Sequence, residues 1–269
     1  MIEELLVCLD SSSPAEEIIP LARSIATAQR ATLTLFRVLQ DPGELAVEEI
    51  HLRDSARRSN AQIKFTISMD PAQAIIEELE KNPGAMAAMT THGRGALGEA
   101  LMGSVASSVL RGSGRPVILY RPLGSRVEAP KRISTVVIAL DGSEFAEKII
   151  PFAVEMAKSL AAGLKLIQAL PVKSPQPPSP LQKQSDLVES SYLHRQAREI
   201  KEAFGVEAQW DVLHGDPADA ICDHVVGMPG TMLAMTSHGR GAIQRALLGS
   251  VVSSCIRHVV CPLLLYWPR

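Results

Sequence analysis

The chain has 269 residues, 46% of them hydrophobic and 21% charged, with a formal net charge of −2 at pH 7. This length suits two domains of ordinary size, and the near-neutral charge disfavours nucleic acid or a membrane surface as partner. Glu3 and Glu4 stand where a secretory signal carries basic residues, and the longest apolar run, residues 259–267, is too short to span a bilayer.

Strands and helices are predicted to alternate along the first half of the chain. Short apolar runs predict strands at residues 4–9, 32–39, 62–68, 85–90 and 117–120. Helical spacing and turn residues predict helices at residues 14–28, 43–60, 71–81 and 104–111. Such alternation is typical of a parallel sheet with helices on both faces, so we predict an α/β fold.

The second half of the chain repeats the first. Residues 90–122 align without gaps to residues 236–268, and 18 of these 33 positions are identical. An earlier match pairs Asp10 with Asp141, at an offset of 131 residues rather than 146. The second copy therefore carries 15 extra residues between the two matches.

These matches predict the domain organisation. The extra residues fall in the proline-rich segment 171–186, which we interpret as an exposed loop because proline disfavours regular structure. Proline, glycine and charged residues predict a linker at residues 123–131. We therefore expect one domain at residues 1–122 and a second at residues 132–269.

Two features of each copy have the chemistry of a ligand site. In open parallel sheets, ligands bind beyond the carboxyl ends of the strands, where the strand order reverses. Asp10 or Asp141, at the end of a first strand, offers a carboxylate to ribose or adenine. A glycine-rich segment then opens a helix, where backbone N–H groups, the helix dipole and an arginine suit phosphates. Its members are Gly93, Arg94, Gly103, Ser104 and Val105, with Gly239, Arg240, Gly249, Ser250 and Val251 in the second copy.

Each of these features also has a purely structural interpretation. Asp10 and Asp141 could cap the helices that follow them, and Gly-Ser pairs are common at helix starts. Both copies, however, contain the aspartate together with the glycine-serine segment, and this joint repetition favours a ligand site. His92 and His238 have no identifiable nucleophile or carboxylate partner, so we interpret them as structural and expect no catalytic residue. We expect no metal site and interpret all four cysteines as buried free thiols: Cys8, Cys222, Cys255 and Cys261.

These motifs resemble the universal stress protein family, whose domains often bind ATP through the pattern G-x-x-G-x9-G-[S/T]. The resemblance covers residues 1–122 and 132–268 and implies two tandem Rossmann-like domains, each with a five-stranded parallel sheet of order 3-2-1-4-5. In that order the first and fourth strands are neighbours, so Asp10 would face the segment that follows the fourth strand. The resemblance also implies main-chain contacts to adenine at Val38 and Ala169.

The sequence departs from the family pattern at two places. Thr90 and Thr236 stand where the family has its first motif glycine, and a β-branched residue is costly there only if the backbone needs a positive φ. The glycine of the family's G-D-P-A turn is kept as Gly215 but replaced by Met69 in the first copy. We expect Met69 to crowd a ligand there, and hence the second domain to be the better binder.

The sequence as a whole predicts a cytoplasmic stress-response protein that binds ATP, ADP or AMP, with or without Mg²⁺, as a regulatory or protective module. A slow ATP hydrolase and a nucleotide-free scaffold are the alternatives; the sequence contains no P-loop motif. Family members pair through their last strands, here residues 117–120 and 262–266. The resemblance therefore implies an intramolecular pseudo-dimer, with a homodimer as a further option.

Overall fold

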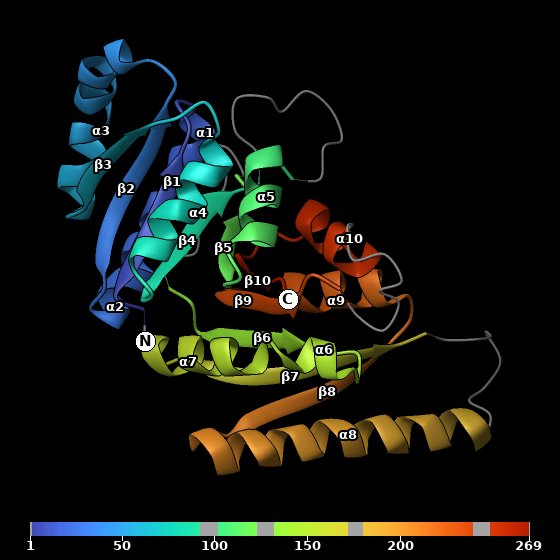
Figure 1. The fold of residues 1–269 in the computed structure, drawn as a ribbon. Helices are drawn as coiled ribbons and strands as arrows, with labels where there is room; N and C mark the ends of the chain where they lie inside the picture. The colour runs from blue at the N-terminus through green and yellow to red at the C-terminus, as the bar shows by residue number, and fades with distance from the viewer. Residues whose placement is uncertain (1, 92–101, 123–131, 172–179, 239–247, 269) are drawn as a thin grey trace. The chain divides into compact units, whose positions relative to one another are not determined.

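The computed structural model describes residues 2–91, 102–122, 132–171, 180–238 and 248–268. It divides into two compact units, Met1–Arg132 and Ile133–Pro268. Each unit is a parallel sheet between helices, so the predicted α/β class is confirmed (Figure 1). Among the described residues, no helix is both long and apolar enough to cross a membrane.

The first unit has the strand order β3-β2-β1-β4-β5, which is the predicted 3-2-1-4-5. Its strands are β1 (Glu4–Leu9), β2 (Thr32–Leu39), β3 (Gln62–Ile67), β4 (Ala85–Thr90) and β5 (Val117–Tyr120). Its helices are α1 (Ser13–Glu16), α2 (Ile19–Gln29), α3 (Leu45–Ser59), α4 (Pro71–Lys81) and α5 (Ser104–Gly112), with a 3₁₀ turn η1 (Pro42–Glu44). Helix α2 contacts α3, and α4 lies beside α5 (Figure 1).

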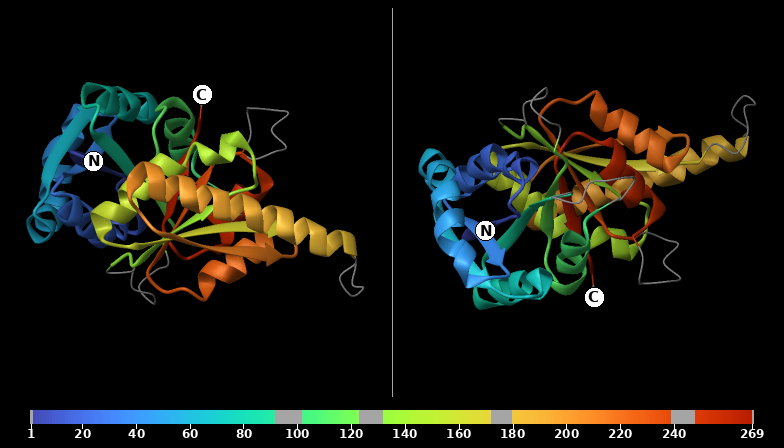
Figure 2. Two further views of the ribbon diagram at one scale, coloured as in Figure 1. Left: turned by 90° about the horizontal axis from the view of Figure 1, so that it is seen from below. Right: turned by 90° about the horizontal axis from the view of Figure 1, so that it is seen from above.

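The second unit repeats this order as β8-β7-β6-β9-β10. Its strands are β6 (Thr135–Ala139), β7 (Gly163–Leu170), β8 (Ala208–His214), β9 (Thr231–Thr236) and β10 (Leu263–Tyr266). Its helices are α6 (Glu144–Glu147), α7 (Ile150–Leu160), α8 (Pro180–Phe204), α9 (Pro217–Val226) and α10 (Ser250–His258). Helix α8 packs along β7 and β8, and its length stands out in both views of Figure 2.

Proline and aspartate fix where several helices begin. Asp70 accepts a hydrogen bond from the backbone N–H of Gln73 (3.0 Å), and Asp216 caps α9 in the same way. A proline follows each aspartate at the first helical position, where its missing N–H costs nothing. The predicted helix at residues 14–28 is two helices, α1 and α2, because Pro20 has no N–H with which to continue α1.

The sequence predicts an exposed loop at residues 171–186, and this prediction is wrong for the last part of the segment. Helix α8 begins at Pro180, so residues 180–186 are helical, while residues 172–179 lie outside the described part. Proline is tolerated in a first helical turn, and the Leu, Gln and Lys residues that follow are good helix formers. The predicted linker at residues 123–131 also lies outside the described residues.

Candidate functional site

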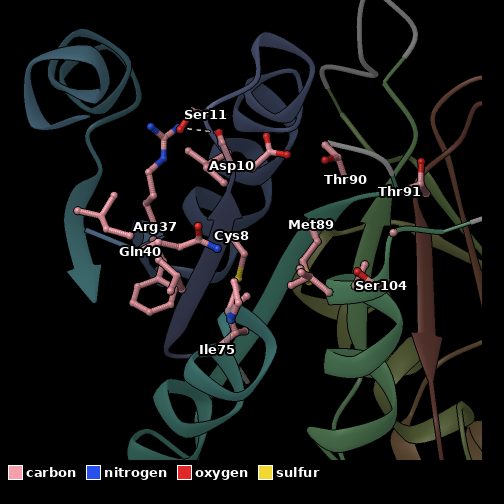
Figure 3. Close-up of a pocket in the computed structure, with 18 of the residues that line it drawn as sticks. Cys8, Asp10, Ser11, Arg37, Gln40, Ile75, Met89, Thr90, Thr91 and Ser104 are labelled. Carbon is pink, nitrogen blue, oxygen red and sulfur yellow. Dashed lines mark hydrogen bonds between the residues drawn. The ribbon is translucent and has the colours of Figure 1, made fainter. Parts of the chain in front are cut away.

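A cavity of about 590 Å³ opens at the carboxyl ends of β1, β2 and β4. These strands surround the point where the chain leaves the sheet in opposite directions, which is where open parallel sheets bind ligands. Figure 3 shows Asp10 and Ser11 on one side of the cavity, with Thr90, Thr91 and Ser104 across from them. The volume lies within the range typical of small-molecule sites.

The structure brings together most of the first-domain residues that the sequence singled out. Six of them line the cavity: Asp10, Val38, Thr90, Gly103, Ser104 and Val105. Gly93 and Arg94 lie outside the described residues, as do His92 and, in the second copy, Gly239 and Arg240. The residues selected from the sequence motifs and from the family resemblance thus line one cavity.

Asp10 shapes the turn after β1 and does not occupy the helix-cap position itself. Its Oδ1 accepts from the backbone N–H of Ser12 (3.0 Å) and from the Ser12 hydroxyl, and Ser12 is the N-cap of α1. Asp141 accepts from Ser143 in the same two ways, at 3.0 and 2.6 Å. Ser143 in turn caps α6 by accepting from the N–H of Ala146 (3.1 Å). Each aspartate therefore orders the serine that precedes a helix.

A glycine, Gly103, precedes the first turn of α5 at the wall of the cavity. The N–H of Gly103 donates to the backbone oxygen of Thr91 (2.8 Å), and the first intrahelical bond runs from Ser107 to Gly103. The N–H groups between them therefore have no acceptor within the helix. A Cβ built on Gly103 would lie 3.6 Å from the Thr91 oxygen, an ordinary contact, so local packing does not require glycine here. Glycine at this position leaves the N–H groups of the first turn without a side chain in front of them.

A buried ion pair that the sequence analysis missed supports the Asp10 turn. Arg37, in β2, is only 1% exposed, and its Nη2 donates to the backbone oxygen of Asp10 (2.6 Å). Its guanidinium also pairs with Glu48 of α3, which accepts from the Ser11 hydroxyl (2.8 Å). The turn is thereby held from both β2 and α3. The one available signal was a single charged residue inside the apolar run of residues 32–39.

The threonines that replace the motif glycine are not strained. Thr90 and Thr236 end strands β4 and β9, and neither is among the described residues with a positive φ. A β-branched residue suits a strand backbone, so these positions do not argue against a ligand.

Met69 does not crowd the cavity, contrary to our expectation from the sequence. Met69 is 78% exposed and does not line the cavity. Gly215 has a φ of 130°, a backbone conformation that only glycine adopts readily, so the turn after β8 explains this glycine without any ligand. Met69 therefore gives no steric reason for the second domain to bind a ligand better than the first.

The remaining predicted residues of the second domain lie at the carboxyl ends of the strands of its own sheet. Asp141 follows β6, Ala169 lies near the end of β7, and Thr236 ends β9, while Gly249, Ser250 and Val251 open α10. His238 is 7% exposed here, with its Nδ1 2.8 Å from the Ser237 hydroxyl. Its ring packs edge-on against Trp267, with centroids 4.5 Å apart, and near Phe145. Among the described residues, no group of three or more His, Cys, Asp or Glu side chains could hold a metal ion.

Comparison with known proteins gives a consistent result for both halves. The sequence profile of the Universal stress protein family matches residues 1–121 and 132–266. A universal stress protein of Methanocaldococcus jannaschii is 27% identical over 135 residues, which are 48% of this chain and 79% of that protein. One of Mycobacterium tuberculosis is 29% identical over 147 residues, 47% of this chain and 46% of that protein.

A solved structure is similar over the whole length. A universal stress protein from Archaeoglobus fulgidus aligns with a TM-score of 0.69 and 22% identity, covering 98% of each chain. At this identity the likeness shows the shared fold, and a fold alone does not determine a ligand.

Proposed function

The chain belongs to the universal stress protein family, and on that premise we propose that its first domain binds an adenine nucleotide, preferably ATP, as a regulatory signal. The observation that carries the proposal is the cavity at the carboxyl ends of β1, β2 and β4. It combines a carboxylate that suits ribose hydroxyls, apolar walls that suit the base and a helix start that suits phosphates.

The charges around the cavity favour one orientation of the nucleotide. Asp10, Glu44 and Arg37 line the side formed by β1, β2 and η1, and the Arg37 guanidinium is already paired with Glu48. The two carboxylates therefore leave this side negative, and a phosphate would be repelled there. The start of α5 lies across the cavity and offers N–H donors and the positive end of a helix dipole. We therefore place the phosphates at residues 103–106 and the ribose hydroxyls near Asp10.

The apolar lining suits the base. Ile75 of α4 and Met89 of β4 face the same cavity (Figure 3). Val38 of β2 also lines it. Main-chain groups at the end of β2 can pair with the adenine edge without a dedicated side chain. A cytoplasmic location, the pseudo-dimer and the absence of catalysis stay predictions from the sequence.

The test is whether the native protein holds a nucleotide in this cavity. Purified protein should release adenine nucleotide on heating, and ATP titrated into the stripped protein should bind. Gly103→Val should weaken binding about 10- to 100-fold, because one lost charge-assisted hydrogen bond costs about 1.5–3 kcal/mol.

Gly163→Val is the matched control. Its added Cβ would also meet a backbone oxygen, that of Ser134 at 3.7 Å, but Gly163 begins β7 in the other domain. Equal affinity of both variants would refute the phosphate role of α5. Binding of no nucleotide at all would favour the scaffold alternative, and turnover above background would favour a slow hydrolase.

A further inference from the structure

Two cysteine thiols meet between helices α9 and α10 of the second domain. The sulfur atoms of Cys222 and Cys255 lie 3.9 Å apart, and the two helices pack against each other. A disulfide needs the sulfurs at about 2.05 Å, a distance that small side-chain rotations can close from here. Both cysteines are free thiols in this structure.

We propose that Cys222 and Cys255 form a redox-sensitive pair that closes into a disulfide by exchange with a small external disulfide. Cys222 is the sulfur that reacts first, because it is 8% exposed whereas Cys255 is fully buried. The proposal does not require nucleotide binding, and the pair lies in the second domain.

The exchange balances in two steps. The Cys222 thiolate attacks one sulfur of the external disulfide, forming a mixed disulfide and releasing one small thiolate, which takes up the proton that Cys222 lost. Cys255 then loses its proton and attacks the Cys222 sulfur, forming the bond between the helices and releasing the second small thiol. Two protein thiols are oxidised, and one external disulfide is reduced to two thiols.

The surroundings set the rate and the choice of oxidant. Burial raises the pKa of the Cys222 and Cys255 thiols, so few thiolates are present near neutral pH and exchange is slow. Asp219 and Asp223 also raise the pKa of Cys222 through their negative charge. The same charges repel an anionic disulfide and attract a cationic one.

The cross-link would also have a structural consequence. It closes a chain segment that contains β9 and the start of α10, the helix that carries Gly249 and Ser250. A cross-link of this span restricts the unfolded chain and raises the melting temperature, provided that the native geometry accepts it.

The experiment treats the folded, full-length protein with cystamine, which is cationic, or with glutathione disulfide, which is anionic. We expect the product to be lighter than the reduced protein by two hydrogen atoms, with one peptide pair joined through Cys222 and Cys255. Cystamine should react at least several-fold faster than glutathione disulfide, and Asp219→Asn/Asp223→Asn should shrink that ratio. The oxidised protein should melt at a higher temperature.

Two variants serve as controls. Cys261→Ala removes the third buried thiol of this domain and should leave the cross-link intact. Cys255→Ala should stop the reaction at a mixed disulfide on Cys222. Should that variant fail to fold, the peptide map of the unaltered protein decides alone. A folded protein that gains no disulfide, or one joined through Cys261, would overturn the proposal.

Discussion

The two candidate sites share a backbone frame and differ in the side chains beneath it. In both domains an aspartate orders the next serine, and a helix-opening glycine donates to a backbone oxygen just after the fourth strand of its sheet. Strand register places Gln168 of β7 where the first domain has Arg37. Gln168 is 2% exposed and its Oε1 has no hydrogen-bond partner within the described ranges, whereas Arg37 holds the turn after β1. The duplicated domains thus keep the main-chain geometry while the support for it differs.

Breaking the ion pair should have the largest effect. Arg37→Gln gives the first domain the side chain of the second and leaves Glu48, which is 15% exposed, without its cation. We expect the first domain to lose about 3 kcal/mol of unfolding free energy, the lower end of the range for a buried pair. Gln168→Ala should cost the second domain much less. Denaturant unfolding, with hydrogen exchange to separate the domains, measures both.

The double variant Arg37→Gln/Glu48→Gln is the control. It should be more stable than the sum of the single changes predicts, because it leaves no buried charge alone. Additive effects would show that the two side chains do not act as a unit.

Nucleotide affinity should also separate the domains, in favour of the first. In the full-length chain, Gly103→Val should weaken the tightest ATP binding at least about tenfold, which is about 1.4 kcal/mol. Gly249→Val should leave that binding nearly unchanged, since the turn after β6 lacks the arginine support. Calorimetric titration of both variants measures the difference, and the reverse order would show that Arg37 does not set the ranking.

A smaller difference between the domains, in stability, is expected when alanine replaces the glycine that opens α5 or α10. A Cβ at Gly249 would lie 3.3 Å from the Ser237 oxygen and 3.6 Å from the Cα of His238, tighter than the single 3.6 Å contact at Gly103. Gly249→Ala should therefore destabilise its domain more than Gly103→Ala does, by about 1 kcal/mol of unfolding free energy or less. Melting temperatures of the two variants measure the order. Equal shifts would mean that the His238 segment moves aside freely.

Acid should weaken the second domain before the first. Burial, aided by Lys165 and opposed by Asp211, lowers the pKa of His224 below its usual 6.5. The pKa of His224 is lower in the folded than in the unfolded protein. Its contribution to the free energy of unfolding is therefore present above pH 6.5 and is lost as the pH falls below that value.

In the first domain, burial raises the pKa of Glu78, but Lys64 and Lys81 outweigh burial and hold it below 4.5. The contribution of Glu78 is therefore present above pH 4.5 and is lost only as the pH falls further. Melting curves of His224→Gln and Glu78→Gln against pH test this order. An acid response of the second domain that His224→Gln leaves unchanged would contradict it.

Much of the fold, and several residues of the candidate site in the first domain, could be predicted from the sequence. Strand–helix alternation and the family pattern predicted the sheet order, and the chemistry of a carboxylate and a helix-opening glycine selected Asp10 and Gly103, which line one cavity. These features are local, so the order of residues along the chain carries them.

The errors arose where three-dimensional contacts decide. Arg37 and Glu48 are 11 residues apart on different elements, and only packing of α3 over the sheet brings them together. The size of Met69 predicts crowding, but the direction in which its turn presents the side chain decides whether it meets a ligand, and Met69 is exposed. Proline can interrupt a helix or begin one, and the sequence alone does not distinguish the two at Pro180, where α8 begins.

The position of β1 at the centre of the first sheet constrains the order of events during synthesis. Glu4 of β1 pairs on one side with Thr32 and on the other with Ala85, so half of the central pairing waits for a strand made much later. Contacts so distant along the chain fold slowly, and the exposed edge of β1 is then open to wrong partners. The β1-β2-β3 portion can assemble first as the nascent chain emerges, and strands β4 and β5 complete the sheet. A ribosome stalled before residue 85 should therefore carry a protease-sensitive chain, and one stalled well beyond residue 122 a resistant first domain.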